Sequence, residues 1–141
     1  MSINAVLADT DIMAESAWAV VKVDEQVKKL QAETGLSNNE LVPVPFLHQK
    51  TSGYSVAFNP GTVNGIYMSN SLFATPDPHG PKVNGQDIFK QQLQSVLAPY
   101  GVDVHWVENW DLYHRLLGEV HCGSNATRLV PNNNPWWTSS P

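Results

Sequence analysis

The stretch DIFKQQLQSVLAPYGVDVHWV, residues 87–107, predicts a helix followed directly by a strand. Asp87 can accept hydrogen bonds from the first free backbone N–H groups of that helix. Apolar residues then recur at spacings of three and four and form one face: Ile88, Phe89, Leu93, Val96 and Leu97. Pro99 ends the helix because its ring cannot continue the backbone hydrogen bonds. Alternating apolar residues from Val102 to Trp106 indicate a half-buried strand.

Upstream of this unit, the pattern predicts a second amphipathic helix over residues 14–34. Its apolar residues again recur at three and four: Ala17, Val20, Val23, Val27 and Leu30. Gly35 stands where such a helix would end. The following SNNE, residues 37–40, has the spacing of a capping box, but two prolines in the LVPVP behind it exclude a helix interior. We therefore expect a turn into a short extended edge segment.

The middle of the chain indicates short strands and loops. Residues 54–58 and 63–68 favour two strands, and the turn residues at 59–61 predict that they pair as a hairpin. The stretch TPDPHGPKVNG, residues 75–85, contains three prolines and two glycines and is predicted to be loop. Residues 108–125 favour a short helical turn and then a second extended piece. The fold class predicted from this order is mixed α/β (α+β).

Composition limits the classes of partner. The chain has 141 residues, of which 42% are hydrophobic and 15% charged, so it is expected to fold and to form one domain or part of one. The net charge is −5, and the eight Lys and Arg residues form no basic stripe, so neither nucleic acid nor a membrane is an expected partner. One cysteine cannot form an intrachain disulfide, and no signal peptide is recognisable, so a cytoplasmic location is predicted.

The stretch GEVHCGSN, residues 118–125, contains that one cysteine, Cys122, which could be a nucleophile, a metal ligand or a small buried residue. A nucleophile needs partial exposure and a neighbour that favours the thiolate. Composition alone favours a buried cysteine. His121 is not expected to be its base, because adjacent residues of an extended segment point to opposite faces.

Other residues that could take part in chemistry have ordinary explanations. A metal could be bound by His114, Glu119, His121 and Cys122, but their spacing matches neither a structural zinc site nor HExxH, so no metal site is predicted. His48, His79 and His105 are interpreted as surface or satisfied histidines. Carboxylates near the predicted turn, Glu108, Asp111 and Glu119, could orient a base but are expected to be solvated. Four tryptophans could line a pocket for a cation but are expected to be core and docking anchors: Trp106, Trp110, Trp136 and Trp137.

The stretch DVHWVENWDLYHRLLGEVHCGSN, residues 103–125, with the closing PWW, resembles the C-terminal end of the protein-arginine deiminases, which convert peptidyl arginine to peptidyl citrulline. The resemblance extends back through GPKVNGQDIFKQQLQSVLAPYG, FNPGTVNGIYMSN and VPVPFL and covers about residues 23–137. It implies that residues 1–141 are a C-terminal fragment of the family's catalytic domain. That domain is a pentein, a propeller of ββαβ units, of which this chain would supply roughly the last blade and part of the one before.

The resemblance also implies that Cys122 is the nucleophile that attacks the guanidinium carbon of arginine and forms a covalent intermediate. The family's general acid/base histidine lies in a GHVDE-like motif, and none of the five histidines here has Asp two residues later. That histidine and the family's two aspartates would lie upstream, so the chain alone is expected to be inactive. No cofactor is expected in this chain, although the family makes calcium possible for the complete protein.

One further departure concerns the substrate. Leu116 stands where vertebrate members carry an arginine that helps bind the peptide, and the adjacent Arg115 is expected to point elsewhere, so peptide recognition is expected to differ. The expected partners are an arginine-containing protein or peptide substrate and either the remainder of the catalytic domain or a second copy of the chain. Two alternatives remain: a non-catalytic pentein remnant that acts as a protein-interaction module, and an independent cysteine hydrolase with His105 or His114 as its base.

Overall fold

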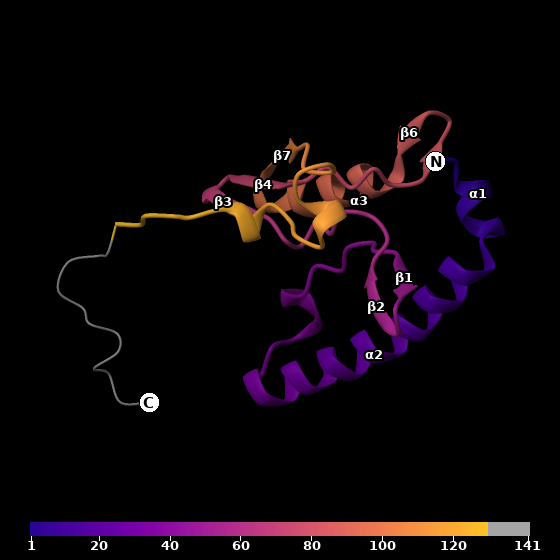
Figure 1. Cartoon of the computed structure of the whole chain (residues 1–141). Helices are drawn as coiled ribbons and strands as arrows, with labels where there is room; N and C mark the ends of the chain where they lie inside the picture. The colour runs from indigo at the N-terminus through magenta and orange to yellow at the C-terminus, as the bar shows by residue number, and fades with distance from the viewer. Residues whose placement is uncertain (130–141) are drawn as a thin grey trace.

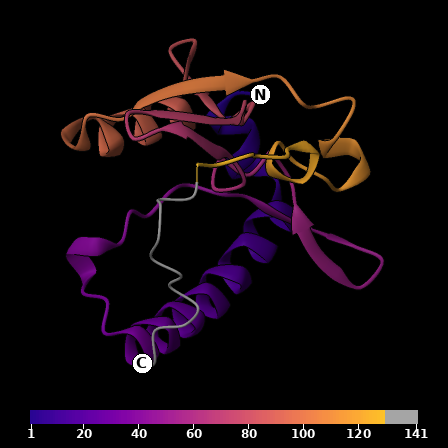
Figure 2. The ribbon, with the colours of Figure 1, turned by 90° about the vertical axis from the view of Figure 1, so that its left-hand side faces the viewer.

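The structure is a computed structural model that describes residues 1–129 of the chain. Small sheets and helices form a mixed α/β arrangement, which confirms the predicted class. A three-stranded sheet with its helix lies on one side of the molecule, and a long helix with a two-stranded hairpin lies on the other (Figure 1). The same separation is visible from the side in Figure 2. No helix among these residues is both long and apolar enough to cross a membrane.

The three-stranded sheet consists of β3 (Ile66–Ser69), β4 (Leu72–Pro76) and β7 (Asp103–Val107), in the order β3-β4-β7. β3 pairs antiparallel with β4, and β4 pairs parallel with β7. Parallel neighbours need a crossover connection, and α3 (Ile88–Leu97) lies in it. The helix and strand predicted from residues 87–107 are both confirmed.

The core lies between α3 and the sheet. Phe73 from β4 packs against Leu93 and Leu97 from α3, and all three are buried. Partly buried apolar residues surround them: Val44, Val96, Val102, Val104 and Trp106. The Asp87 side chain caps the helix by accepting from the backbone N–H groups of residues 89 and 90 at 2.9 and 3.1 Å. One apolar face and one cap therefore account for the position of α3.

The predicted hairpin between residues 54–58 and 63–68 is wrong in its pairing. β2 (Tyr54–Ala57) pairs antiparallel with β1 (His48–Thr51), and β3 pairs with β4. The reason is the two-residue turn at Ser52 and Gly53, whose positive φ angles of 50° and 87° match the tight turn that suits the twist of a hairpin. The strands exist where they were predicted, but the local turn selects a different partner.

The predicted loop at residues 75–85 is shorter than expected. Strand β4 continues through Pro76, and the other end of the stretch contributes to a small hairpin of β5 (Lys82–Val83) and β6 (Gln86–Asp87). Asn84 and Gly85 form its turn with positive φ angles of 49° and 79°. The irregular connection is confined to residues 77–81.

The N-terminal helical region is longer than predicted. Helix α1 (Ile3–Ala8) was not predicted, and α2 spans Thr10–Thr34, with Gly35 at its end as expected. Asp9 caps α2 by accepting from the N–H groups of residues 11 and 12 at 3.1 and 3.0 Å. The SNNE stretch forms a single 3-10 turn, η1 (Asn38–Glu40), in which the Ser37 backbone N–H donates to the Glu40 carboxylate at 2.9 Å. This hydrogen bond lowers the pKa of Glu40.

The apolar stripe of α2 is covered along only part of its length. Near its beginning, Ile12 and Ala19 are buried, and the Ser16 hydroxyl accepts from the His48 backbone N–H of β1 at 3.1 Å. Farther along the helix, Val23 and Leu30 leave 46% and 47% of their surface exposed. Half of this helix is therefore part of the fold, and half presents apolar side chains to its surroundings.

The contact of Leu93 with the sheet generates a stability prediction. Leu93 is 3% exposed in the core, so Leu93→Ala leaves a cavity and is expected to lower the free energy of unfolding by about 2–5 kcal/mol. The control is Leu112→Ala, because Leu112 is 77% exposed and its truncation should change stability by no more than about 0.5 kcal/mol. Urea unfolding measures both, and equal losses in the two variants would contradict this core.

Candidate functional site around Cys122

Cys122 is a free, exposed cysteine on η4 (His121–Gly123). The extended piece predicted here is wrong: η3 (His114–Leu116) and η4 are both 3-10 turns. The interpretation of Cys122 as a buried residue is also wrong. The Tyr113 ring packs directly on Gly123, where a Cβ atom would lie 2.6 and 2.7 Å from the ring carbon Cζ and the hydroxyl oxygen. A glycine after the cysteine therefore lets the turn fold over the ring and leaves the thiol at the surface.

Two hydrogen bonds join the cysteine turn to residue 64. The His121 backbone N–H donates to the Asn64 backbone oxygen at 3.0 Å. The Asn64 side-chain amide donates to the Cys122 sulfur, with 3.9 Å between Nδ2 and Sγ. Segments 58 residues apart in sequence thus meet at the thiol.

A buried carboxylate lies beneath this turn. One oxygen of Glu119 accepts from the Gly61 backbone N–H at 3.3 Å and bonds the His114 Nδ1 at 3.0 Å. The other oxygen accepts from the Asn109 side-chain amide at 2.6 Å. Both Glu119 and His114 are buried, so the prediction of a solvated Glu119 is wrong. The other two carboxylates, Glu108 and Asp111, are exposed as predicted.

A pocket of about 320 Å³ lies beside the cysteine turn. Its lining comes from the β1–β2 hairpin, the turn after β2 and the segment that leads to the cysteine, and includes Phe46, Val63, Asn64, His114, Leu117 and Glu119. Most of the lining is apolar, and the polar groups come from Asn64, His114 and Glu119. Such a pocket can bury an apolar stem and offer hydrogen bonds to a polar end.

The histidines outside the cysteine turn have other surroundings. His114 is held by Glu119, and His105 is exposed on β7. The His48 ring bonds the Ser55 hydroxyl at 3.3 Å, and burial lowers the pKa of His48, opposed by Glu15. Within residues 1–129, the side-chain hydrogen bond to the Cys122 sulfur comes from Asn64 rather than from an imidazole.

Two sequence departures can also be located. Leu116, which the resemblance aligns with an arginine of vertebrate members, is 77% exposed. Arg115 pairs with Asp111 at 3.4 Å, and both side chains are largely exposed.

Of the tryptophans, Trp106 packs against the core, and the Lys90 ammonium lies 5.3 Å from its ring centroid. The Trp110 ring lies edge-on to His79 and tilted against His114, at 5.3 and 4.8 Å between ring centroids. Trp136 and Trp137 lie outside the described residues.

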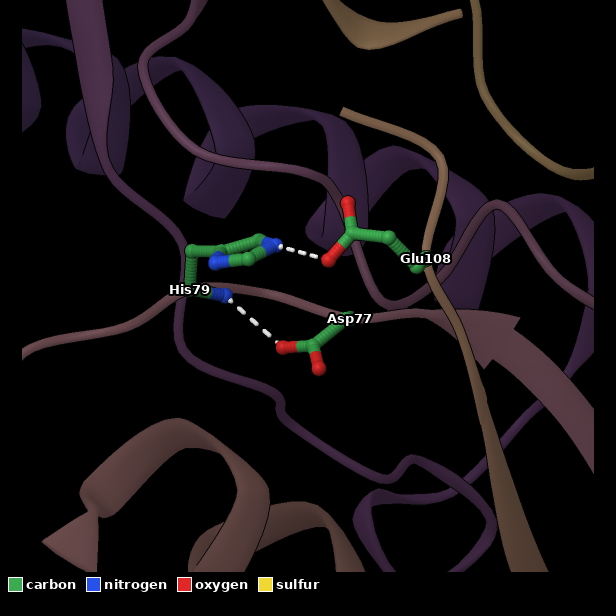
Figure 3. Close-up of side chains that lie close together, drawn as sticks. All are labelled: Asp77, His79 and Glu108. Carbon is green, nitrogen blue, oxygen red and sulfur yellow. Dashed lines mark hydrogen bonds and ion pairs between the residues drawn. The ribbon is translucent and has the colours of Figure 1, made fainter. Parts of the chain in front are cut away.

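A second polar group lies where β4 and β7 end. Asp77, His79 and Glu108 each offer a ligand atom within 4.8 Å of the others (Figure 3). His79 Nε2 pairs with Glu108 at 2.8 Å, and the His79 backbone N–H donates to Asp77 at 3.2 Å. Sequence reasoning missed the group because its members are up to 31 residues apart, from 77 to 108. The group could have been found from the sequence by noting that polar residues follow two strands expected to be parallel neighbours, because such strands end at the same edge of a sheet.

This group does not fit calcium. Calcium prefers about six to eight oxygen ligands, whereas the group offers two carboxylates and one imidazole nitrogen. The Lys90 ammonium already binds one oxygen of Asp77 and supplies positive charge. The group is better explained as an ion-paired network at the sheet edge. The residues considered together as metal ligands from sequence are also not all brought together, since His114 binds Glu119 while Cys122 contacts Asn64.

Comparison with known proteins assigns the chain to a family. The family "Protein-arginine deiminase (PAD)" matches residues 1–138. The chain is 36% identical over 140 residues, or 99% of its length, to "Protein-arginine deiminase type-1" of Mus musculus, and covers 21% of that protein. It is 32% identical over 141 residues to the type-3 enzyme of Rattus norvegicus and 29% identical over 140 residues to the type-4 enzyme of Homo sapiens, again covering 21% of each.

The chain therefore belongs to the protein-arginine deiminase family. This confirms the family inferred from residues 103–125. The chain spans about a fifth of the length of the curated relatives it matches.

The buried Glu119 generates a second prediction. Glu119→Ala removes the acceptor for three donors and is expected to lower the free energy of unfolding by about 2–4 kcal/mol. Glu119→Gln should lose less, because its side-chain oxygen can still accept from the Gly61 N–H and from His114. If the Asn109 amide turns over, the Gln amide can also donate to the Asn109 oxygen, which is buried and has no partner within residues 1–129. Thermal and urea unfolding measure both variants, with Glu33→Ala on the exposed surface of α2 as control. An Ala variant as stable as the control would contradict the network.

Proposed function

We propose that this chain is the C-terminal, nucleophile-bearing portion of a protein-arginine deiminase, with Cys122 as the nucleophile. The reaction is the hydrolysis of peptidyl arginine to peptidyl citrulline and ammonia. The observation that carries the proposal is an exposed thiol on a turn beside a pocket, in a chain matched by the family over residues 1–138. A surface thiol can reach a substrate side chain, which a buried cysteine cannot.

In the proposed reaction, the Cys122 thiolate attacks the guanidinium carbon, and a C–N bond breaks as ammonia leaves. Water then attacks the same carbon, breaks the C–S bond and releases citrulline with the thiol restored. These steps need a proton donor and acceptor and groups that hold the guanidinium. Among the described residues, the imidazole beneath the cysteine turn is already held by Glu119. The missing groups are therefore proposed to come from upstream of this chain.

The order of elements supports a pentein arrangement. β3, β4, α3 and β7 form a ββαβ unit with the helix on the sheet, as one propeller blade requires. Helix α2 is followed, after η1, by strand β1, an αβ order that suits the end of a preceding blade. We propose that the strands completing that blade lie upstream and pack on the open half of α2.

A second candidate is a non-catalytic pentein remnant that acts as a protein-interaction module. The observation that favours it is the same exposed stripe on α2, which includes Val20, Val23 and Leu30. Exposed apolar patches of this kind mark interaction sites. In the first candidate, the partner of α2 is the rest of a catalytic domain, which also supplies the missing catalytic groups. In the second candidate, the partner is another protein chain and no reaction is catalysed. Calcium dependence of the complete protein and a cytoplasmic location remain predictions from the family and the composition.

The catalytic proposal is tested by citrulline formation. The 141-residue chain alone is expected to produce no measurable citrulline from arginine peptides, because the general acid/base and the groups that hold the guanidinium are proposed to lie upstream. A longer protein that includes the upstream part of the domain should be active and should lose activity in Cys122→Ala. A colorimetric ureido assay with ammonia release measures both. Citrulline from the chain alone, lost on Cys122→Ala, would show that the upstream groups are not needed.

The partner proposal is tested by association state. The isolated chain is expected to self-associate through α2, and Val23→Glu should reduce this because it places a charge in the exposed stripe. Ala32→Glu is the matched control, since it lies about half a turn around the same helix and is exposed. Light scattering measures the mass of each. A monodisperse monomer of the unmodified chain would argue against an unfilled surface on α2.

A further inference from the structure

The Cys122 thiol is not alone at its site, because the amide of Asn64 lies against it. Nδ2 of Asn64 lies 3.9 Å from Sγ, a length suited to an N–H donor and a sulfur acceptor. We propose that Asn64 is a positioning residue of this site, which donates to the cysteine sulfur, stabilises its thiolate form and fixes its direction of attack. This inference deepens the proposed function and rests on it.

The turn that carries Asn64 is held by the sheet. Its own N–H donates to the Gly61 oxygen at 3.0 Å, which closes a tight turn over residues 61–64. The Thr75 hydroxyl of β4 donates to the Thr62 backbone oxygen. Gly65 lies so close to β4 that a Cβ atom would stand 2.8 Å from the Phe73 ring and 2.9 Å from Thr75 Cα. The backbone of the turn that carries the amide is therefore held by the central strand of the sheet.

The cysteine segment, residues 119–122, forms hydrogen bonds to both ends of the same turn. Glu119 accepts from the Gly61 N–H at 3.3 Å, and the His121 N–H donates to the Asn64 oxygen at 3.0 Å. These two bonds bracket the contact between the amide and the sulfur. Residues 61–64 and 119–122 consequently form one unit, in which the backbones that carry the amide and the thiol are held together.

The chemistry gives the amide a specific role. The thiolate is the reactive form of cysteine, and a hydrogen bond donated to an anion stabilises that anion. An asparagine amide is a neutral donor that carries no competing charge, and it does not remove the proton itself. Replacing it with an aspartate of the same shape would remove the donor and place a like charge beside the thiolate. Removing the donor alone, as in Asn64→Ala, and removing it while adding a charge, as in Asn64→Asp, should therefore both make the thiol less reactive, and the second should do so more strongly.

The test is the rate at which iodoacetamide alkylates Cys122 at a fixed neutral pH, measured by mass spectrometry in the 141-residue chain. Asn64→Ala is expected to slow alkylation by about threefold to tenfold, the effect of one lost hydrogen bond. Asn64→Asp should slow it further because of charge repulsion. Asn70→Ala is the matched control, since Asn70 is exposed in the β3–β4 turn.

Folding and activity readouts separate the possible explanations. Unfolding midpoints show whether each variant is folded, and Asn64→Asp keeps the side-chain shape if Asn64→Ala does not fold. In an active longer protein that includes the upstream part of the domain, Asn64→Ala should lower the kcat per folded molecule more than it changes KM. A loss of stability alone would lower only the fraction of folded molecules and leave the kcat of each folded molecule unchanged. Asn64→Asp alkylated at the unmodified rate, with an unchanged midpoint, would overturn the proposal.

The alkylation test is independent of the deiminase reaction. Iodoacetamide requires only a reactive thiol, and neither arginine nor the upstream groups take part. If alkylation depends on Asn64 while no citrulline forms in any longer protein, the positioning role stands and the proposed function fails. If citrulline forms but alkylation is insensitive to both substitutions at Asn64, the proposed function stands and the positioning role fails.

Discussion

The parallel pairing of β4 with β7 is the constraint on which the rest of the structure depends. Two parallel neighbours cannot be joined by a tight turn, so the chain must cross over, and α3 fills that crossing and covers the sheet. The pairing also brings both strands to an end at one edge. There Asp77 donates its backbone N–H to the Val107 oxygen at 2.8 Å, and the chain leaves β7 toward the cysteine. The fold and the place of the thiol thus have a common origin.

Elements determined by local chemistry could be predicted from sequence. The spacing of Leu93 and Leu97, with Asp87 before them and Pro99 after them, defines α3 within a residue or two. Strand pairing could not be predicted in the same way, because residues 54–58 and 63–68 carry strand patterns that do not say which partner they take. The Ser52–Gly53 turn did contain that information, but its two residues are a weaker signal than the prolines and glycines farther on.

At the candidate site, too, part of the arrangement could be predicted from sequence and part could not. Cys122 could be identified because its neighbours in sequence carry the family resemblance. Its contacts could not, since Asn64 and Gly61 reach the cysteine segment across 58 residues, and a sequence pattern carries no signal for such a distance. Glu119 was expected in solvent because charged residues near turns normally are. It is buried because three donors converge on it, which only the folded chain arranges.

Within residues 1–129, helix α2 has one half anchored to a hairpin and another half whose apolar side chains are largely exposed, and this difference affects local stability. An isolated helical segment of a few turns is marginal in water. The anchored half should therefore persist through fluctuations in which the other half opens, although a bond from the Gln31 side chain to Asn38 at 2.8 Å ties the far end to the next turn. Any surface that covers the open half would also order it, so its association would include a folding step and would be weaker than rigid docking of the same area.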